Sequence, residues 1–209
     1  MLRAAFVLSA LLAIASSDAL FDFRPLFLIT KPLTTLLLLV LATRRGGPRG
    51  VRRAILAGLA LSLTGDIALM FELGFVAGLA AFLCAHLLYL HGFTREARLA
   101  ERVWPFAVYA AIGGGFVTYL WPDLPAGLRM PVLLYVVALA AMAAQAAVRW
   151  RVLDDGRAGL AALGGLAFVA SDAMLAIDRF HAPWPTASAF VLASYWTAQA
   201  LIVAVLPRR

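Results

Sequence analysis

The sequence predicts an all-α integral membrane protein, a single polytopic domain over residues 1–209 built as a bundle of eight transmembrane helices. The 209 residues are 64% hydrophobic and only 14% charged, and the mean hydropathy is +0.91. A water-soluble domain cannot cover so much apolar surface. The net charge of +7 does not indicate nucleic-acid binding, because the basic residues lie in short loops between apolar runs.

Eight apolar segments approach the length of about 20 residues that a helix needs to span the hydrocarbon core. We expect helices at approximately 4–20, 25–43, 53–72, 74–92, 104–121, 131–148, 158–177 and 187–206. Proline and glycine mark several of the joints between them. Residues 1–15 also fit a cleaved signal peptide, but the seven apolar segments that follow favour a first membrane helix.

Positive charge gathers on one side of the predicted bundle. Of the 18 Lys and Arg residues, fourteen fall on the side that holds the N-terminus. These are Arg3, Arg44, Arg45, Arg49, Arg52, Arg53, Arg95, Arg98, Arg102, Arg149, Arg151, Arg157, Arg208 and Arg209. The positive-inside rule therefore predicts that both termini are cytoplasmic, and we expect the membrane to be a bacterial inner (plasma) membrane.

Asp66 and Asp172 are carboxylates inside long apolar runs. An acid near the centre of a membrane helix costs about 2.5–3.5 kcal/mol on insertion scales, so it calls for a structural or chemical reason. The two aspartates are 106 residues apart, and so are Tyr89 and Tyr195. This weak repeat suggests two parallel four-helix halves, an arrangement that commonly places a binding site where the halves meet.

Other polar side chains also fall inside the predicted helices. They are Lys31, His86, Tyr89, Ser171, Tyr195 and Gln199. His86 and Tyr89 share a helix face, as do Tyr195 and Gln199, because residues three or four apart are neighbours on a helix. Taken singly, such groups commonly hold membrane helices together. A lysine together with two aspartates favours a functional site, because ions within the membrane are usually functional.

Lys31 is the natural counter-ion for one carboxylate, which would leave the other protonated, as when two acids share a desolvated site. The pair would then supply one proton donor and one acceptor. The three histidines are too scattered for a zinc site. Ser171 lies on a helix rather than at the strand-turn-helix elbow of serine hydrolases. We therefore expect acid–base chemistry that needs no metal and no cofactor.

An ordered set of short motifs resembles the YhhN family, which includes the lysoplasmalogenases. The motifs are Lys31-Pro32, Gly58-Leu59, Gly65-Asp66, Phe82-x-x-x-His86-x-x-Tyr89, Phe168-x-x-Ser171-Asp172 and Tyr195-x-x-x-Gln199. The resemblance implies an eight-helix membrane hydrolase. Members of the family cleave the vinyl ether bond of lysoplasmalogens, which releases a fatty aldehyde and glycerophosphoethanolamine or glycerophosphocholine.

The two aspartates suit that chemistry, because vinyl ether hydrolysis begins with protonation of carbon and passes through an oxocarbenium-like cation. A carboxylic acid can donate the proton, and a carboxylate can stabilise the cation and activate water, as in glycosidases. We predict that Asp66 and Asp172 are catalytic. The other six polar residues are expected to bind or orient water and the substrate, a lysophospholipid or another ether lipid.

Two other functions fit part of the pattern. A small proton-coupled transporter would explain the parallel repeat, although paired broken helices are missing from the two halves of the sequence. A non-catalytic membrane scaffold would need the polar groups for helix association alone. Under all three functions the expected partners are membrane lipids and not nucleic acid.

Overall fold

The computed structural model describes residues 1–208, and Arg209, one of the basic residues counted at the C-terminus, lies outside them. Within this range the chain is helical, and its one β contact is an isolated bridge between Arg45 and Arg208. In chain order the helices are α1 (Leu2–Ala15), α2 (Arg24–Thr43), α3 (Arg49–Ala68), the short η1 (Glu72–Gly74), α4 (Phe75–Phe93), α5 (Val103–Leu120), α6 (Ala126–Leu153), α7 (Gly156–Phe180) and α8 (Ala187–Ala204).

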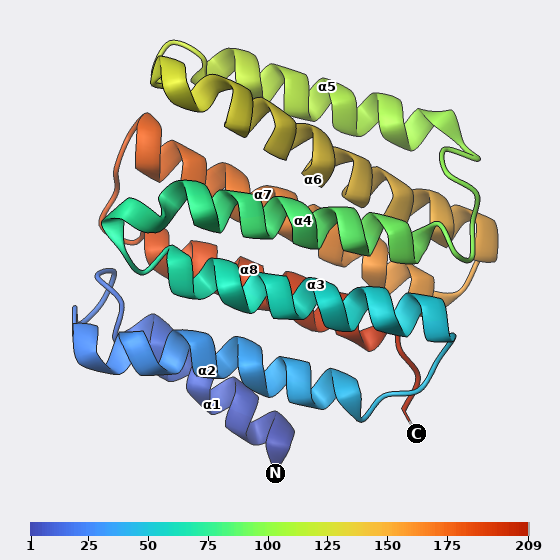
Figure 1. Cartoon of the computed structure of the whole chain (residues 1–209), viewed down its shortest axis with the longest axis horizontal. Helices are drawn as coiled ribbons and strands as arrows, with labels where there is room; N and C mark the ends of the chain where they lie inside the picture. The colour runs from blue at the N-terminus through green and yellow to red at the C-terminus, as the bar shows by residue number, and fades with distance from the viewer. Residues whose placement is uncertain (209) are drawn as a thin grey trace.

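The helices form a two-layered bundle with their axes roughly aligned (Figure 1). α3 packs most extensively against α4, and α7 against α8. In the view of Figure 1, α7 and α8 lie behind α4 and α3, while α5 and α6 form one edge and α1 and α2 the other. α5 joins the bundle through α6 and, more lightly, through α7.

Six helical segments of residues 1–208 are long and apolar enough to cross a membrane. They are α2, η1 with α4, α5, α6, α7 and α8. α1 is apolar but has 14 residues, and α3, which begins with three arginines in its first five residues, is not among the six. Large apolar side chains such as Leu11, Leu36 and Leu134 remain exposed on the bundle, as expected for a surface that faces lipid. The protein is thus a multi-pass membrane protein.

α1 ends at Ala15, before the predicted limit of residue 20, because a polar turn follows it. Ser16 and Ser17 donate their hydroxyls to carbonyls of the last turn of α1 at 3.3 and 2.7 Å. Asp22 then adopts a left-handed φ of 46°, a conformation that aspartate tolerates better than most residues. The chain reverses here into α2.

Two glycines of α3 allow α4 to approach closely. A Cβ atom on Gly58 would lie 2.3 Å from Cε1 of Tyr89, and one on Gly65 would lie 2.6 Å from Cδ2 of Phe82. Small residues at such contacts are typical of membrane helix packing. The close approach fixes two aromatic rings of α4 beside the site described below.

α6 extends beyond the predicted range 131–148 at both ends, and its C-terminal half holds the connection between α4 and α5. The buried amide of Gln145 accepts a hydrogen bond from the backbone of this connection at 3.1 Å and donates to two of its carbonyls at 3.1 and 3.2 Å. Arg149 donates to the carboxylate of Glu96 at 2.6 and 2.9 Å. These polar groups can extend the helix past its apolar segment because the connecting chain supplies partners for them.

Candidate active site

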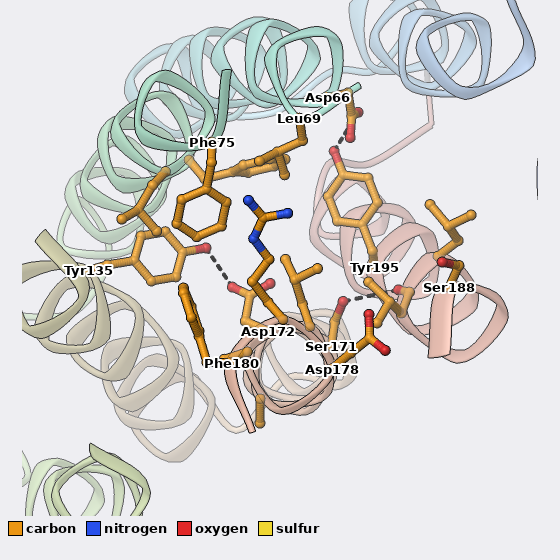
Figure 2. Close-up of a pocket in the computed structure, with 18 of the residues that line it drawn as sticks. Asp66, Leu69, Phe75, Tyr135, Ser171, Asp172, Asp178, Phe180, Ser188 and Tyr195 are labelled. Atoms are coloured by element: carbon orange, nitrogen blue, oxygen red, sulfur yellow. Dashed lines mark hydrogen bonds between the residues drawn. The ribbon is translucent and has the colours of Figure 1, made fainter. Parts of the chain in front are cut away.

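A cavity of about 540 Å³ extends into the bundle from the end where α2 begins and α7 ends. Its walls come from the α1–α2 turn and from α2 to α8. Five of the predicted site residues line it, namely Lys31, Asp66, Ser171, Asp172 and Tyr195. The other three, His86, Tyr89 and Gln199, are fully buried behind the wall. Figure 2 shows the two aspartates on separate helices, each with a tyrosine hydroxyl turned toward it.

Asp66 on α3 is 1% exposed and accepts two hydroxyl hydrogen bonds on one oxygen. Thr35 of α2 donates to Oδ2 at 2.5 Å, and Tyr195 of α8 donates to the same atom at 2.8 Å. Hydroxyl donors stabilise an ionised carboxylate, because it offers only acceptor atoms. Two helices, α2 and α8, therefore supply this carboxylate of α3 with donors that suit its charged form.

Buried groups on α8 and α4 orient these two hydroxyls. Gln199 donates to the hydroxyl of Tyr195 at 3.4 Å and accepts from Tyr89 at 2.7 Å. The indole N–H of Trp196 donates to the hydroxyl of Thr35 at 3.2 Å. Each hydroxyl thus accepts one hydrogen bond and donates its own proton to the carboxylate, which fixes the direction of both donors.

Asp172 on α7 has a different environment. Its side chain is 16% exposed and accepts one hydroxyl hydrogen bond, from Tyr135 of α6 at 2.5 Å. His86 Nε2 of α4 lies 3.0 Å from the same tyrosine oxygen and 3.7 Å from Oδ2 of Asp172. The carboxyl, phenol and imidazole therefore form a compact group through which a proton can be exchanged.

Phe168 on α7 separates the two polar groups. Its fully buried ring meets His86 edge-on at a centroid distance of 4.9 Å and Tyr195 at 5.7 Å. No hydrogen bond found among residues 1–208 joins the Asp172 group to the Asp66 group. His86 and Tyr89, predicted to share a face, thus belong to different groups.

Ser171 and Lys31 line the cavity in other ways. The hydroxyl of Ser171 donates to the carbonyl of Val191 at 3.0 Å, which ties α7 to α8. Lys31 is 8% exposed, and no carboxylate of residues 1–208 lies within 4.0 Å of its ammonium group. Its Nζ atom lies 5.6 Å from the centre of the Phe27 ring. Lys31 therefore shares a cavity with both aspartates without forming a direct ion pair with either.

Three residues at the site are missing from the sequence prediction: Thr35, Tyr135 and Trp196. Each lies in a segment correctly expected to be helical, and a hydroxyl or indole within an apolar run was the available signal. That signal is weak, because such groups are common in membrane helices and carry little insertion cost.

The possible metal ligands at the cavity are carboxylates and hydroxyls, with the imidazole of His86 buried behind its wall. Within the part of the chain that the structure describes, no three His, Cys, Asp or Glu side chains converge as metal ligands would. Two carboxyl groups in unlike surroundings can hold different protonation states at one pH. The arrangement is therefore suited to proton donation from one wall of the cavity and proton acceptance at the other.

Comparison with known proteins places the chain in a family. The family model YhhN matches residues 26–206. Human "Lysoplasmalogenase TMEM86B" is 35% identical over 74% of this chain and 64% of that protein. The pig protein of the same name is 34% identical over 82% of this chain and 70% of its own length.

A protein named "Lysoplasmalogenase" from Mycobacterium tuberculosis is 34% identical over 73% of this chain. The chain spans 60% of that relative, so it covers less than two thirds of the mycobacterial and human proteins. No solved structure gives a significant match. Because the family model covers almost the whole bundle, including the eight site residues predicted from the sequence, the chain belongs to the YhhN family.

Proposed function

We propose that the protein is a membrane hydrolase of the lysoplasmalogenase type, which cleaves the vinyl ether bond of a lysoplasmalogen into a fatty aldehyde and a glycerophospho head group. The observation that carries the proposal is the pair of carboxyl groups, in unlike hydrogen-bonding environments, that face one cavity inside an apolar bundle. Membership of the YhhN family and the names of its relatives support the same reaction.

Asp172 is the proton donor of this reaction. It faces the cavity and accepts one hydroxyl hydrogen bond, whereas Asp66 accepts two. Its side chain is 16% exposed, whereas Asp66 is 1% exposed, so Asp172 is the carboxyl group that can reach the alkenyl carbon of a bound substrate. Asp66, held by Thr35 and Tyr195, is the ionised partner that stabilises the cation and accepts a proton from water.

The protons balance over the cycle without an outside source. Asp172 protonates the alkenyl carbon distant from the ether oxygen, and the adjacent carbon becomes part of an oxocarbenium ion. Water adds to that carbon as Asp66 takes its proton, which gives a hemiacetal. As the hemiacetal collapses, Asp66 returns its proton to the glycerol oxygen and the hemiacetal hydroxyl proton passes to Asp172. The carbon–oxygen bond breaks, and both carboxyl groups recover their starting states.

The apolar part of the cavity suits the alkenyl chain. Ile112 and Phe116 of α5 and Val136 of α6 line it together with the two aspartates. A long chain gains about 0.8 kcal/mol for each methylene that it buries. This wall would therefore hold the chain while its first two carbons lie between the carboxyl groups.

Tyr135 acts as a positioning residue for Asp172. Tyr135→Phe is expected to lower kcat about tenfold, equivalent to about 1.4 kcal/mol in the barrier, because Asp172 loses its 2.5 Å hydrogen bond while the ring still fills its place. KM should stay nearly constant, since an interaction with the acid does not hold the substrate itself.

The matched control is Tyr119→Phe. Tyr119 is 51% exposed and does not line the cavity, so both kinetic constants should equal those of the wild type. A rise in KM with unchanged kcat in Tyr135→Phe would instead make Tyr135 a substrate-binding residue and remove it from the proton path.

The proposed topology has eight spans and cytoplasmic termini, in the plasma membrane of a bacterium. The excess of basic residues on the side of the N-terminus supports this orientation. The 14-residue α1 would then cross a locally thinned bilayer or reach only part of its depth. The mouth of the cavity would open on the opposite, outer side.

The reaction is tested with purified protein and a lysoplasmenyl-ethanolamine substrate. We expect fatty aldehyde and glycerophosphoethanolamine to appear in equal amounts, and no fatty acid to be released from the matching 1-acyl lipid. Absence of aldehyde would overturn the proposal. Proton-dependent solute flux in liposomes without product formation would point to a transporter instead.

A further inference from the structure

Three cationic side chains line the cavity above the two catalytic aspartates. They are Lys31 of α2, Arg24 at the start of α2 and Arg179 near the end of α7. The ion pairs found in residues 1–208 involve other groups, so none of the three cations has a carboxylate within 4.0 Å. A cavity with three unpaired cations on its wall is a candidate site for an anion.

Lys31 gives the strongest reason to expect a ligand. It is more than nine-tenths buried, its ammonium group lies over the face of Phe27, and the Asp66 carboxylate acts on it only from beyond the 4.0 Å of an ion pair. An ammonium group carries three donors, and a buried charge without a partner is costly. A bound anion in the cavity would relieve that cost.

Arg179 and Arg24 are also placed so that N–H groups of their guanidinium side chains remain available to a ligand. The guanidinium of Arg179 lies 4.9 Å from the centre of the Phe75 ring, and stacking on an aromatic face leaves the N–H groups at its edge free for a phosphate. Arg24 donates one long hydrogen bond, of 3.4 Å, to the carbonyl of Met70.

Lys31 and Arg179 lie closer to the mouth of the cavity than the two aspartates, where the head group of a bound lipid would be. Lys31 is four residues before Thr35, the residue that binds Asp66, so it lies about 6 Å along α2 toward the mouth. Arg179 is seven residues after Asp172, about 10 Å along α7 in the same direction. In a lysoplasmalogen the glycerol unit separates the ether oxygen from the phosphate, so a phosphate would lie on the mouth side of the scissile bond.

The same mouth also carries negative charge. Asp18, Asp22, Glu72 and Asp178 line it without pairing with the cations. Four carboxylates would repel a free phosphate dianion. A zwitterionic head group would be accepted, because its phosphate can meet the cations while its amine meets the carboxylates.

We propose that Lys31, Arg24 and Arg179 form a phosphate-binding subsite for the zwitterionic phosphodiester head group of a lysolipid, and that the subsite fixes the position of the lipid above Asp66 and Asp172. The identity of the bond cleaved below it rests on the proposed function. Phosphate binding itself does not, because it requires no reaction.

Binding is therefore measured with ligands that are not hydrolysed. The probes are 1-O-alkyl-glycero-3-phosphoethanolamine, which has a saturated ether, 1-O-alkylglycerol with the same chain but no phosphate, and inorganic phosphate. Titration calorimetry on the full-length wild-type protein in neutral detergent should show at least tenfold tighter binding of the phosphate-bearing lipid, as one or more charge-assisted hydrogen bonds would give. Inorganic phosphate should not displace it.

Lys31→Met and Arg179→Gln should each reduce this preference about tenfold, the effect of losing one charge-assisted contact. Arg129→Gln is the matched control, because Arg129 also stacks on an aromatic ring, that of Trp121 at 4.9 Å, yet does not line the cavity. It should keep the wild-type preference. If Lys31→Met fails to fold, as judged by size-exclusion chromatography, Arg179→Gln at the rim decides the test.

Equal binding of the two lipids by the wild type, or an unchanged preference in the folded variants, would overturn the subsite. Displacement of the lipid by inorganic phosphate would show a site for free anions and would also overturn it. Phosphate-dependent binding without aldehyde release from a vinyl ether lipid would leave the subsite standing and refute only the proposed hydrolysis. If an alkenylglycerol were hydrolysed as efficiently as a lysoplasmalogen, the subsite would be refuted and the proposed hydrolysis would stand.

Discussion

Replacing Asp172 by Asn is expected to lower kcat for vinyl ether hydrolysis by about 10²–10⁴-fold, the usual contribution of a general acid. Asparagine keeps the shape of the side chain and can still accept the hydrogen bond from Tyr135, but it has no acidic proton to give to carbon. Release of aldehyde by the purified variant measures the effect. KM should change little, because the lost proton transfer takes place only in the transition state and does not hold the bound substrate.

Asp66→Asn should reduce kcat to a similar extent for a different reason. Its amide oxygen can accept one or both of the hydroxyl hydrogen bonds from Thr35 and Tyr195, but the negative charge that stabilises the oxocarbenium ion is gone. The variant with both substitutions should be about as slow as the slower single variant, since groups that act in one step are not additive.

Asp123→Asn is the control for both aspartates. Asp123 pairs with His181, and both side chains are 36% exposed. It does not line the cavity, so this variant should hydrolyse the lipid at the wild-type rate. A correctly folded Asp172→Asn or Asp66→Asn protein with most of the wild-type activity would rule out the acid–base assignment for that residue.

Gly58→Ala is expected to cause a large loss of stability from a single methyl group. The new Cβ atom would lie 2.3 Å from Cε1 of Tyr89, a ring that is fully buried and hydrogen-bonded to Gln199. Overpacking of this kind costs about 1–3 kcal/mol. The free energy of unfolding and Tm in detergent should both fall, and movement of Tyr89 should also disturb the chain of hydrogen bonds to Asp66.

Gly114→Ala provides the comparison, because a Cβ at this position in α5 meets nothing within 4 Å. Alanine is favoured over glycine in a helix interior by about 0.5–1 kcal/mol, so Gly114→Ala should match or slightly exceed the wild type in stability. Equal melting temperatures for the two alanine variants would contradict the close packing of α3 on α4.

The sequence identifies the two aspartates because a carboxylate in an apolar run is costly and therefore conspicuous. It does not identify the groups that distinguish them. Tyr135 and Thr35 provide the short hydrogen bonds to Asp172 and Asp66, but a hydroxyl in a membrane helix is common and inexpensive. Which hydroxyl meets which carboxylate depends on how the helices pack, and helical spacing alone contains no such information.

The internal repeat of 106 residues also fails to predict which residues are partners in the site. It relates Asp66 to Asp172 and Tyr89 to Tyr195. In the structure, however, Tyr195 binds Asp66 across the bundle, and Tyr89 binds Gln199. The two aspartates are thus matched in sequence but not in partners. Under the proposed function, this difference in surroundings would allow two identical side chains to take opposite roles.

The peripheral position of α5 bears on where the products go. Tyr109, Ile112 and Phe116 of α5 line the cavity, although α5 joins the bundle mainly through α6 at its edge (Figure 1). An aldehyde formed beside this wall would be next to the hydrocarbon of the bilayer, and the charged head group would be at the aqueous mouth. Cleavage would thus release the apolar aldehyde into the bilayer and the charged head group into water. Neither product would have to cross a region in which it is poorly soluble.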